Sequence, residues 1–304
     1  MSKRFGNIFS YPYRSLSRRA FLMGAMANIM VPTAQRALFR LPRQTALNRS
    51  ILNIVAHEDD DLLFLSPDLL HAIQAGKRVR TIYVTAGDAG SNSTYWQHRQ
   101  SGEAAAYAQM GNVANSWIQT NADIDSHPIS IFTLADRPTV SLAFLHLPDG
   151  GHGQGFSSTR NESLQKLWVG SISTIHTVDG SFGYSKSTLI KALIRLMALF
   201  QPDLICTQDY VGSYGDGDHS DHHSVAYFVQ AAVQHSAMPV SLRGYKGYGI
   251  ADLPANVIGA DLLAKRQVFF TYSSYDSHIC SSSSNCTESR YEQLLARQYI
   301  VNSR

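Results

Sequence analysis

Short apolar runs alternate with helical patterns from residue 50 to about residue 235, and this alternation most constrains the fold of the chain. A crossover helix is the usual connection between parallel strands, so this order predicts a parallel sheet covered by helices. We expect strands at 50–56, 79–85, 141–147 and 203–207, and helices at 66–76, 95–110, 187–200 and from about 222. The sequence therefore predicts an α/β fold: a Rossmann-like three-layer sandwich with a mostly parallel sheet and a smaller C-terminal portion.

The basic residues of the chain are concentrated at its N-terminus. Seven of the 26 Lys and Arg residues lie within residues 1–40, and none of the 23 Asp and Glu residues does. The rest of the chain therefore carries 19 basic against 23 acidic side chains and is mildly acidic. This balance gives no compositional argument for a surface that binds nucleic acid, whose phosphates attract Lys and Arg.

The basic N-terminal segment has features of an export signal. Ser17-Arg18-Arg19-Ala20-Phe21-Leu22 resembles the twin-arginine signal, and a modest apolar stretch runs from Ala20 to Val31. That stretch is about half of the roughly 20 residues that a membrane-spanning helix needs, so we expect no stable transmembrane span. We interpret residues 1–40 as a twin-arginine-type signal peptide or an uncleaved N-terminal anchor, with an ordinary basic tail as the alternative. The signal predicts a periplasmic or extracellular location.

The three cysteines fall into two groups. Cys280 and Cys286 flank a Ser-rich loop whose length allows a small disulfide ring in an oxidising compartment, and two free thiols are the alternative. Cys206 lies inside an apolar run and is expected to be a buried core thiol rather than a reactive one.

A cluster of ionisable residues, His57-Glu58-Asp59-Asp60-Asp61, comes directly after the first predicted strand. In open α/β sheets, ligand sites lie beyond the carboxyl ends of the strands. An imidazole and a carboxylate three residues apart on such a turn can converge on one cation. The alternative is an acidic first helical turn that only complements the helix dipole.

A second cluster, His219-Ser220-Asp221-His222-His223, follows the predicted strand at 203–207 within a Gly- and Asp-rich loop. Two clusters that follow two strands of one parallel sheet lie at the same edge. Together they supply a His2Asp-type metal site with an open position, which suits Zn²⁺ carrying a water and also suits non-haem Fe²⁺.

The two clusters resemble the sequence signatures of a known enzyme family. Residues 57–61 look like the Ala-His-Pro-Asp-Asp-Glu signature of the PIG-L/LmbE deacetylases, and residues 219–222 look like their second His-x-Asp-His motif. Further similarities span about residues 50–276 and include Val84–Gly90, Arg99 with Glu103, Gln201–Asp203, Lys265 and Tyr272–Ser274. The resemblance implies one deacetylase domain over residues 48–304.

The resemblance also implies roles for individual residues. Its metal ligands would be His57, Asp60 and His222, which would hold one Zn²⁺ per chain. Asp59 would be the general base. A protonated His219, held by Asp221, would stabilise the oxyanion.

Three further residues are candidates for substrate binding by the same resemblance: Arg99, Asp149 and Tyr214. For Arg99 the alternative is a surface helix arginine paired with Glu103, four residues later. The chain departs from the family pattern where Glu58 replaces a proline, and where Asp216–Asp218 lengthens the loop between Tyr214 and His219.

The resemblance thus implies a metal-dependent hydrolase that removes the N-acetyl group from an N-acetylglucosamine-type substrate, a small molecule or a glycan. The alternatives are an amidase of the same fold acting on a non-sugar or thiol-conjugate amide, and a non-catalytic metal- or glycan-binding protein. A nucleotide-binding oxidoreductase is disfavoured, because an acidic turn rather than a Gly-rich loop follows the first strand. The motifs specify neither the aglycone nor the oligomeric state.

Overall fold

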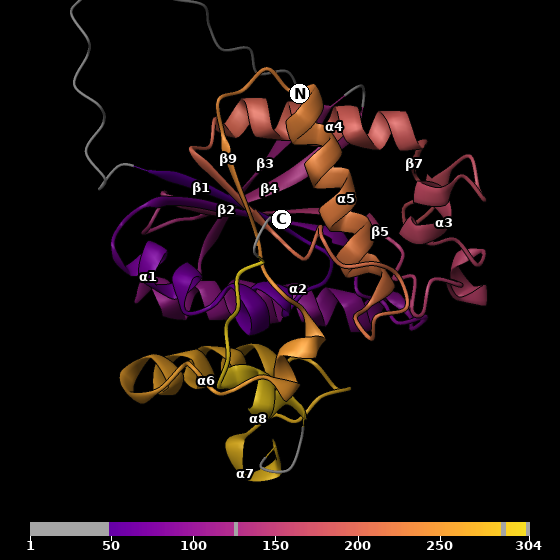
Figure 1. Cartoon of the computed structure of the whole chain (residues 1–304). Helices are drawn as coiled ribbons and strands as arrows, with labels where there is room; N and C mark the ends of the chain where they lie inside the picture. Colours follow the sequence, from indigo (N-terminus) through magenta and orange to yellow (C-terminus); the bar gives the residue numbers. More distant parts are fainter. Residues whose placement is uncertain (1–48, 125–126, 287–289, 302–304) are drawn as a thin grey trace, which may run out of the picture. The chain divides into compact units, whose positions relative to one another are not determined.

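Figure 1 shows the computed structural model of the chain, which describes residues 49–124, 127–286 and 290–301. The export signal expected within residues 1–40 lies outside these ranges. Within them, no helix combines the length and the apolar character that crossing a membrane requires.

The described residues form a seven-stranded sheet with the strand order β3-β4-β5-β2-β1-β8-β9. Neighbours from β5 through to β9 in this order are parallel, whereas β4 runs antiparallel to β5 and β3 antiparallel to β4. The strands are β1 Ser50–Val55, β2 Arg78–Thr85, β3 Trp117–Ile124, β4 His127–Leu134, β5 Val140–Leu147, β8 Leu204–Thr207 and β9 Ser241–Gly244. The prediction of a mostly parallel sheet is confirmed, and the four expected strands lie within one residue of their predicted bounds.

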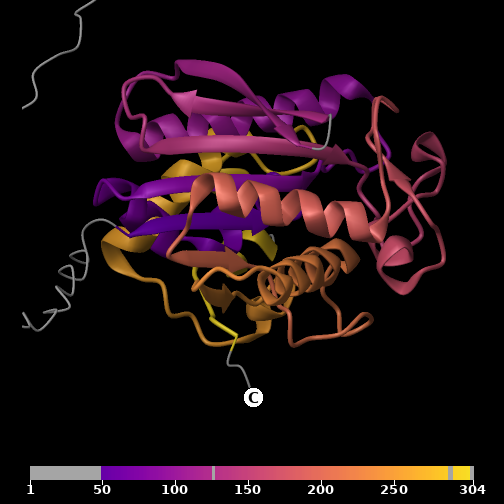
Figure 2. The same ribbon diagram turned by 90° about the horizontal axis from the view of Figure 1, so that it is seen from above.

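Helices cover both faces of the sheet and form the predicted three-layer sandwich (Figures 1 and 2). One core packs between the sheet and α1 and α2, and the other between the sheet and α3, α4 and α5. Along β1, Leu52 and Ile54 belong to one core and Val55 to the other, because successive strand side chains point to opposite faces. These helices are α1 Asp68–Gln74, α2 Ser93–Gly111, α3 Leu164–Val169, α4 Lys186–Phe200 and α5 Ser220–His235.

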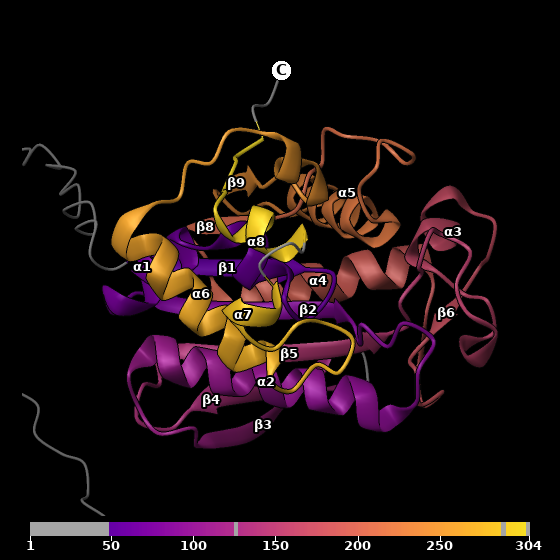
Figure 3. The ribbon, with the colours of Figure 1, turned by 90° about the horizontal axis from the view of Figure 1, so that it is seen from below.

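The smaller C-terminal portion consists of three helices, drawn in gold to yellow in Figure 3: α6 Gly259–Ser273, α7 Ser283–Cys286 and α8 Arg290–Leu295. Helix α6 packs on α2, and its Phe269 and Tyr272 join the core on that side of the sheet. A disulfide joins Cys280 and Cys286, which confirms the small ring and excludes two free thiols. Cys206 is a buried free thiol, as predicted.

Some elements were not expected from the sequence. A π-helical turn, η2 Asp61–Leu65, precedes α1, and its Leu63 carbonyl accepts a hydrogen bond of 2.7 Å from Nζ of the buried Lys265. The hairpin of β3 and β4 escaped prediction because its strands are only partly buried and lack a strict polar and apolar alternation. The remaining short elements are η3 Ser157–Thr159, β6 Ile175–His176, β7 Gly183–Tyr184 and η4 Tyr248–Asp252.

Candidate active site and metal centre

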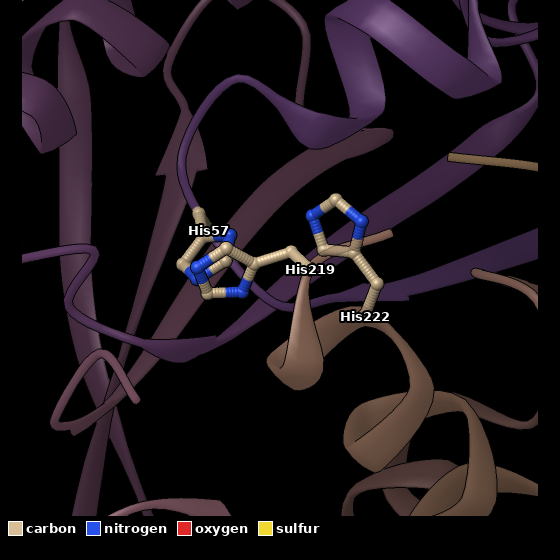
Figure 4. Close-up of side chains that lie close together, drawn as sticks. All are labelled: His57, His219 and His222. Carbon is tan, nitrogen blue, oxygen red and sulfur yellow. The ribbon is translucent and has the colours of Figure 1, made fainter. Parts of the chain in front are cut away.

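Loops at the carboxyl ends of β1 and β8 bring three histidines together (Figure 4). His57 follows β1, whereas His219 and His222 lie at the start of α5, and their ring centroids are 4.5 to 5.4 Å apart. One nitrogen from each ring lies within 4.8 Å of the others. Strands β1 and β8 are parallel neighbours, so clusters far apart in the sequence meet at one edge of the sheet, as predicted.

Asp60 lies between two of these histidines. Its Oδ2 atom is 3.2 Å from Nδ1 of His57, and its Oδ1 atom is 2.9 Å from Nε2 of His222. Asp60 and His222 are fully buried, and His57 is 5% exposed. Oδ1 of Asp60 and Nε2 of His222 face each other as this ion pair and make no hydrogen bond with any other described residue.

This arrangement fits a divalent metal ion. Two imidazole nitrogens and a carboxylate are a donor set typical of zinc sites with an open position, and one nitrogen each of His57, His219 and His222 forms a group that could hold a metal ion. Oδ1 of Asp60 and Nε2 of His222 are buried 2.9 Å apart, and a cation bound to both would satisfy these atoms. The structure therefore brings together the three residues that were predicted as ligands: His57, Asp60 and His222.

A further carboxylate faces the distal nitrogen of each of these histidines. Nε2 of His57 is 3.3 Å from Oδ2 of Asp221, and Nδ1 of His222 is 2.8 Å from Oδ1 of Asp218. A histidine that donates its distal N–H to a carboxylate keeps the other nitrogen as a lone pair for a metal. Burial opposes a charge on His222, but Asp60 and Asp218 outweigh it and raise the pKa of His222 to about 10. The site therefore favours a cation.

Sequence analysis missed two residues that fix this arrangement. Gln208, directly after β8, donates a hydrogen bond of 2.7 Å from Nε2 to Oδ2 of Asp60. Asp218 accepts hydrogen bonds from the backbone N–H groups of His219 (2.9 Å) and Tyr248 (3.0 Å) in addition to that from His222. The position of Asp218, one residue before the second motif, was a usable signal, whereas no motif marks Gln208.

Asp59, the predicted general base, precedes Asp60, one of the predicted metal ligands, with 4% of its surface exposed. Its Oδ1 atom is 3.1 Å from Nη2 of Arg99. Burial raises the pKa of Asp59 well above its ordinary value, and Arg99 only partly opposes this shift. A carboxylate in this environment accepts a proton more readily than an exposed one.

His219 has a different charge state from the one predicted. Nδ1 of His219 caps α5 by accepting the backbone N–H of Asp221 at 3.2 Å, which places the ring proton on Nε2. Burial and the nearby His57 lower the pKa of His219 to about 4. The Asp221 carboxylate is also closer to His57 (3.3 Å) than to His219 (3.8 Å). His219 is therefore a neutral hydrogen-bond donor here, not the cation that we expected Asp221 to stabilise.

The three candidates for substrate binding lie in different surroundings. Arg99 is buried, with its guanidinium group bound to protein atoms, and does not line the cavity beside the site. Asp149 lies next to His219, with its Oδ1 atom 3.6 Å from Nε2. Tyr214 borders a cavity of about 600 Å³ that reaches His219, but its hydroxyl lies 2.9 Å from Oγ of Ser224. The ring of Tyr214 thus remains available to a substrate, whereas Asp149 is buried, does not line this cavity, and accepts the backbone N–H of Gly151 at 2.7 Å with its Oδ1 atom.

A search of protein-family models and of solved structures gives the following matches. The model of PIG-L, GlcNAc-PI de-N-acetylase, matches residues 52–233. The structure is similar to that of the A40926 pseudoaglycone deacetylase Dbv21, with 15% identity, a TM-score of 0.45, and coverage of 80% of this chain and 86% of that one. It is also similar to N,N'-diacetylchitobiose deacetylase from Pyrococcus horikoshii, with 13% identity, a TM-score of 0.44, and coverage of 81% and 75%.

A third similar structure is that of GalB, the 4-carboxy-2-hydroxymuconate hydratase from Pseudomonas putida KT2440, with 12% identity, a TM-score of 0.42, and coverage of 81% and 82%. No curated protein sequence matches the chain. The family model covers more than half of the 304 residues and includes both the His57 and the His222 clusters. The chain therefore belongs to the PIG-L family of GlcNAc-PI de-N-acetylases.

Proposed function

We propose that this protein is a metal-dependent deacetylase that hydrolyses the N-acetyl group of an N-acetylglucosamine-type substrate. The observation that carries the proposal is the buried set of His57, Asp60 and His222, beside a carboxylate, Asp59, that is not part of the set. We propose Zn²⁺, one ion per chain, as the metal, with Fe²⁺ as the alternative.

The metal would lower the pKa of a water towards 7 and act as a Lewis acid on the amide carbonyl. Asp59 would take the proton from the attacking water, since burial raises the pKa of its carboxyl group. Nε2 of the neutral His219 would donate a hydrogen bond to the carbonyl oxygen as negative charge develops there. When the C–N bond breaks, Asp59 would return its proton to the departing nitrogen, which leaves acetate and a free amine.

The cavity beside His219 supports a saccharide substrate. Apart from two glycines, its lining residues have polar or aromatic side chains: His152, Gln165, Tyr214, Gly215, Gly217, Asp218, His219, Ser220, Tyr248 and Arg290. Sugar hydroxyl groups find hydrogen-bond partners in such a lining, and tyrosine rings can cover the apolar face of a sugar. A volume of about 600 Å³ is ample for an N-acetylated sugar with an attached group.

An acetate-release assay over a panel of N-acetylated sugars, combined with metal analysis, tests this proposal. We expect Asp59→Asn to keep its metal and to lose turnover by about 10²- to 10⁴-fold. His222→Ala should lose the metal, whereas His71→Ala is the matched control, since His71 is exposed and pairs with Asp261. Undiminished acetate release by Asp59→Asn would exclude Asp59 as the base.

The same assay separates the alternatives. Release of an acyl group from non-sugar amides alone would favour an amidase of the same fold. Binding of metal and glycan without turnover of any acetylated compound would favour a non-catalytic binding protein.

We also propose that residues 1–40 direct export through a twin-arginine pathway to the periplasm or the exterior. The arginine pair at Arg18 and Arg19 supports this, and the Cys280–Cys286 disulfide is of a kind that persists in oxidising compartments. Replacing both arginines with lysine should retain the protein in the cytoplasm, as measured by fractionation. Unchanged export of that variant would contradict the proposal.

A further inference from the structure

The backbone of Asp59 has a φ angle of +101°, which residues other than glycine rarely adopt. Such a conformation costs free energy and persists only where the surrounding structure holds it, most often at functional sites. The groups that bind this turn therefore help to determine where the carboxylate of Asp59, the proposed base, lies.

Glu103 holds the turn through its backbone. Its Oε1 atom accepts a hydrogen bond of 3.0 Å from the backbone N–H of Asp59, and its Oε2 atom accepts one of 2.7 Å from the hydroxyl of Tyr83. Glu103 is fully buried, so the carboxylate has a fixed place between these two donors. The N–H that it binds belongs to the residue with the positive φ angle.

Arg99 lies on α2, four residues before Glu103, and its side chain also binds the turn at Asp59. Its Nη2 atom donates to the carbonyl oxygen of Glu58 and lies 3.1 Å from Oδ1 of Asp59. Its Nη1 atom donates to the carbonyl oxygen of Gly87 at 2.6 Å, and its Nε atom donates to the hydroxyl of Tyr272 at 2.7 Å. Each nitrogen of the guanidinium group is thus bound to protein.

The C-terminal portion completes this frame. The hydroxyl of Tyr272, on α6, also lies 3.1 Å from the carbonyl oxygen of Glu58, and Oδ2 of Asp276 is 3.1 Å from Nε of Arg99. Arg99 and Glu103 do not pair with each other, although their spacing allows it. They bind opposite sides of the Asp59 turn instead.

We propose that Arg99 and Glu103 form a clamp that holds the strained Asp59 turn and aims its carboxylate at the reacting water. Both act as positioning residues for Asp59. The proposal rests on the proposed deacetylation for its kinetic consequences, but its conformational consequence is independent of that function.

Gly87 offers a perturbation that removes no polar group. A methyl group at this position would overlap Nη1 and Cζ of Arg99 and Oε2 of Glu58, and would displace the guanidinium group and the Glu58 side chain. Gly76 is the matched control: it has a similar positive φ of +73°, against +52° at Gly87, but a methyl group there meets no atom within 4 Å. Both Gly→Ala changes impose backbone strain, and only Gly87→Ala disturbs the clamp.

We expect Glu103→Ala and Gly87→Ala to lower kcat by about 100-fold, the loss typical of a reacting group displaced by about 1 Å. KM and metal content should stay within about threefold of the wild type, and Gly76→Ala should keep wild-type kcat. Glu103→Gln retains an oxygen that can accept the Asp59 N–H, so it should recover most of the turnover that Glu103→Ala loses. The double variant of Asp59→Asn and Glu103→Ala should lose little more turnover than Asp59→Asn alone, because Glu103 acts through the Asp59 carboxylate.

The proposal is overturned if Glu103→Ala and Gly87→Ala raise KM with kcat unchanged, since Arg99 would then bind substrate. It is also overturned if metal content falls in proportion to kcat, which would indicate a general structural role. Crystal structures of the variants provide a readout that needs no activity. The φ angle of Asp59 should leave the positive region in Glu103→Ala and stay there in Gly76→Ala. If the wild type deacetylates nothing, the proposed function fails while this conformational comparison still decides the clamp.

Discussion

Asp218 is expected to set the metal affinity of the site, although it is not a proposed ligand. Its Oδ1 atom accepts hydrogen bonds from Nδ1 of His222 (2.8 Å) and from the backbone N–H groups of His219 (2.9 Å) and Tyr248 (3.0 Å). Burial opposes its negative charge, but His222 and these donors prevail and lower the pKa of Asp218 to about 2. Asp218→Ala would leave the distal N–H of His222 without its acceptor and free the imidazole to rotate.

The expected loss can be bounded. Removing a carboxylate that orients a metal-binding histidine typically costs 10- to 100-fold in metal affinity, or about 1.4 to 2.8 kcal/mol. We expect Asp218→Ala to lose close to 100-fold in metal affinity, because Oδ1 of Asp218 binds the proposed ligand His222 and also the backbone N–H groups of His219 and Tyr248. Asp218→Asn keeps an oxygen acceptor but removes the charge, so its affinity should fall less than that of Asp218→Ala.

Competition with a chelating dye at fixed pH measures the metal Kd of each variant. Asp261→Ala is the matched control, because Oδ1 of Asp261 also pairs with a histidine, Nε2 of His71 at 2.8 Å, and both side chains are exposed and outside the site. Asp261→Ala should leave the Kd within about twofold of the wild type. An Asp218→Ala variant with wild-type metal affinity would refute the assignment of His222 as a ligand oriented by this carboxylate.

Three further predictions concern residues outside the catalytic turn. Burial lowers the pKa of Lys265 to about 7, so between pH 7 and 10.5 the unfolded chain binds more protons than the folded chain, and stability rises with pH. Lys265→Met should flatten this rise by up to about 1.4 kcal/mol per pH unit in urea titrations, and pH profiles parallel to those of the wild type would contradict the prediction. Replacing Cys280 and Cys286 with serine should lower the free energy of unfolding by about 2 kcal/mol, and a reductant should then destabilise only the wild type. Gln208→Leu removes the amide that donates a hydrogen bond to Asp60 and should weaken metal binding about tenfold in the dye assay. An unchanged Kd would show that metal binding does not depend on this hydrogen bond.

The place of the site was predictable from the sequence because of parallel-sheet geometry. The clusters at His57 and His222 each follow an apolar run, and parallel strands direct their carboxyl ends to one edge. The sequence does not show that β1 and β8 are neighbouring strands. In the structure they are neighbours, and Asp60 lies 2.9 Å from His222. The choice of His57, Asp60 and His222 as ligands came instead from the resemblance to the family signatures.

The supporting residues were not predictable in the same way. Glu103 and Tyr272 reach the Asp59 turn from α2 and α6, and nothing in the local sequence around either residue indicates this contact. The spacing of Arg99 and Glu103 is equally compatible with an exposed ion pair on a helix surface. Packing of α6 on α2 buries both side chains, and this burial turns an ordinary i, i+4 pair into a frame for the catalytic turn. Burial of polar residues by a distant helix leaves no periodic signal in the sequence.

The longer loop from Asp216 to Asp218 shows how a departure from a motif can carry structural meaning. In the sequence it was only an interruption between Tyr214 and the second motif. In the structure its last residue supplies the carboxylate that orients His222, and the carboxylate of its first residue pairs with His223. Because these two aspartates bind successive histidines that point in different directions, the loop fixes the rotation of α5 about its axis. That rotation decides which histidine faces Asp60, so shortening the loop should misplace the ligand even if every residue of the second motif is kept.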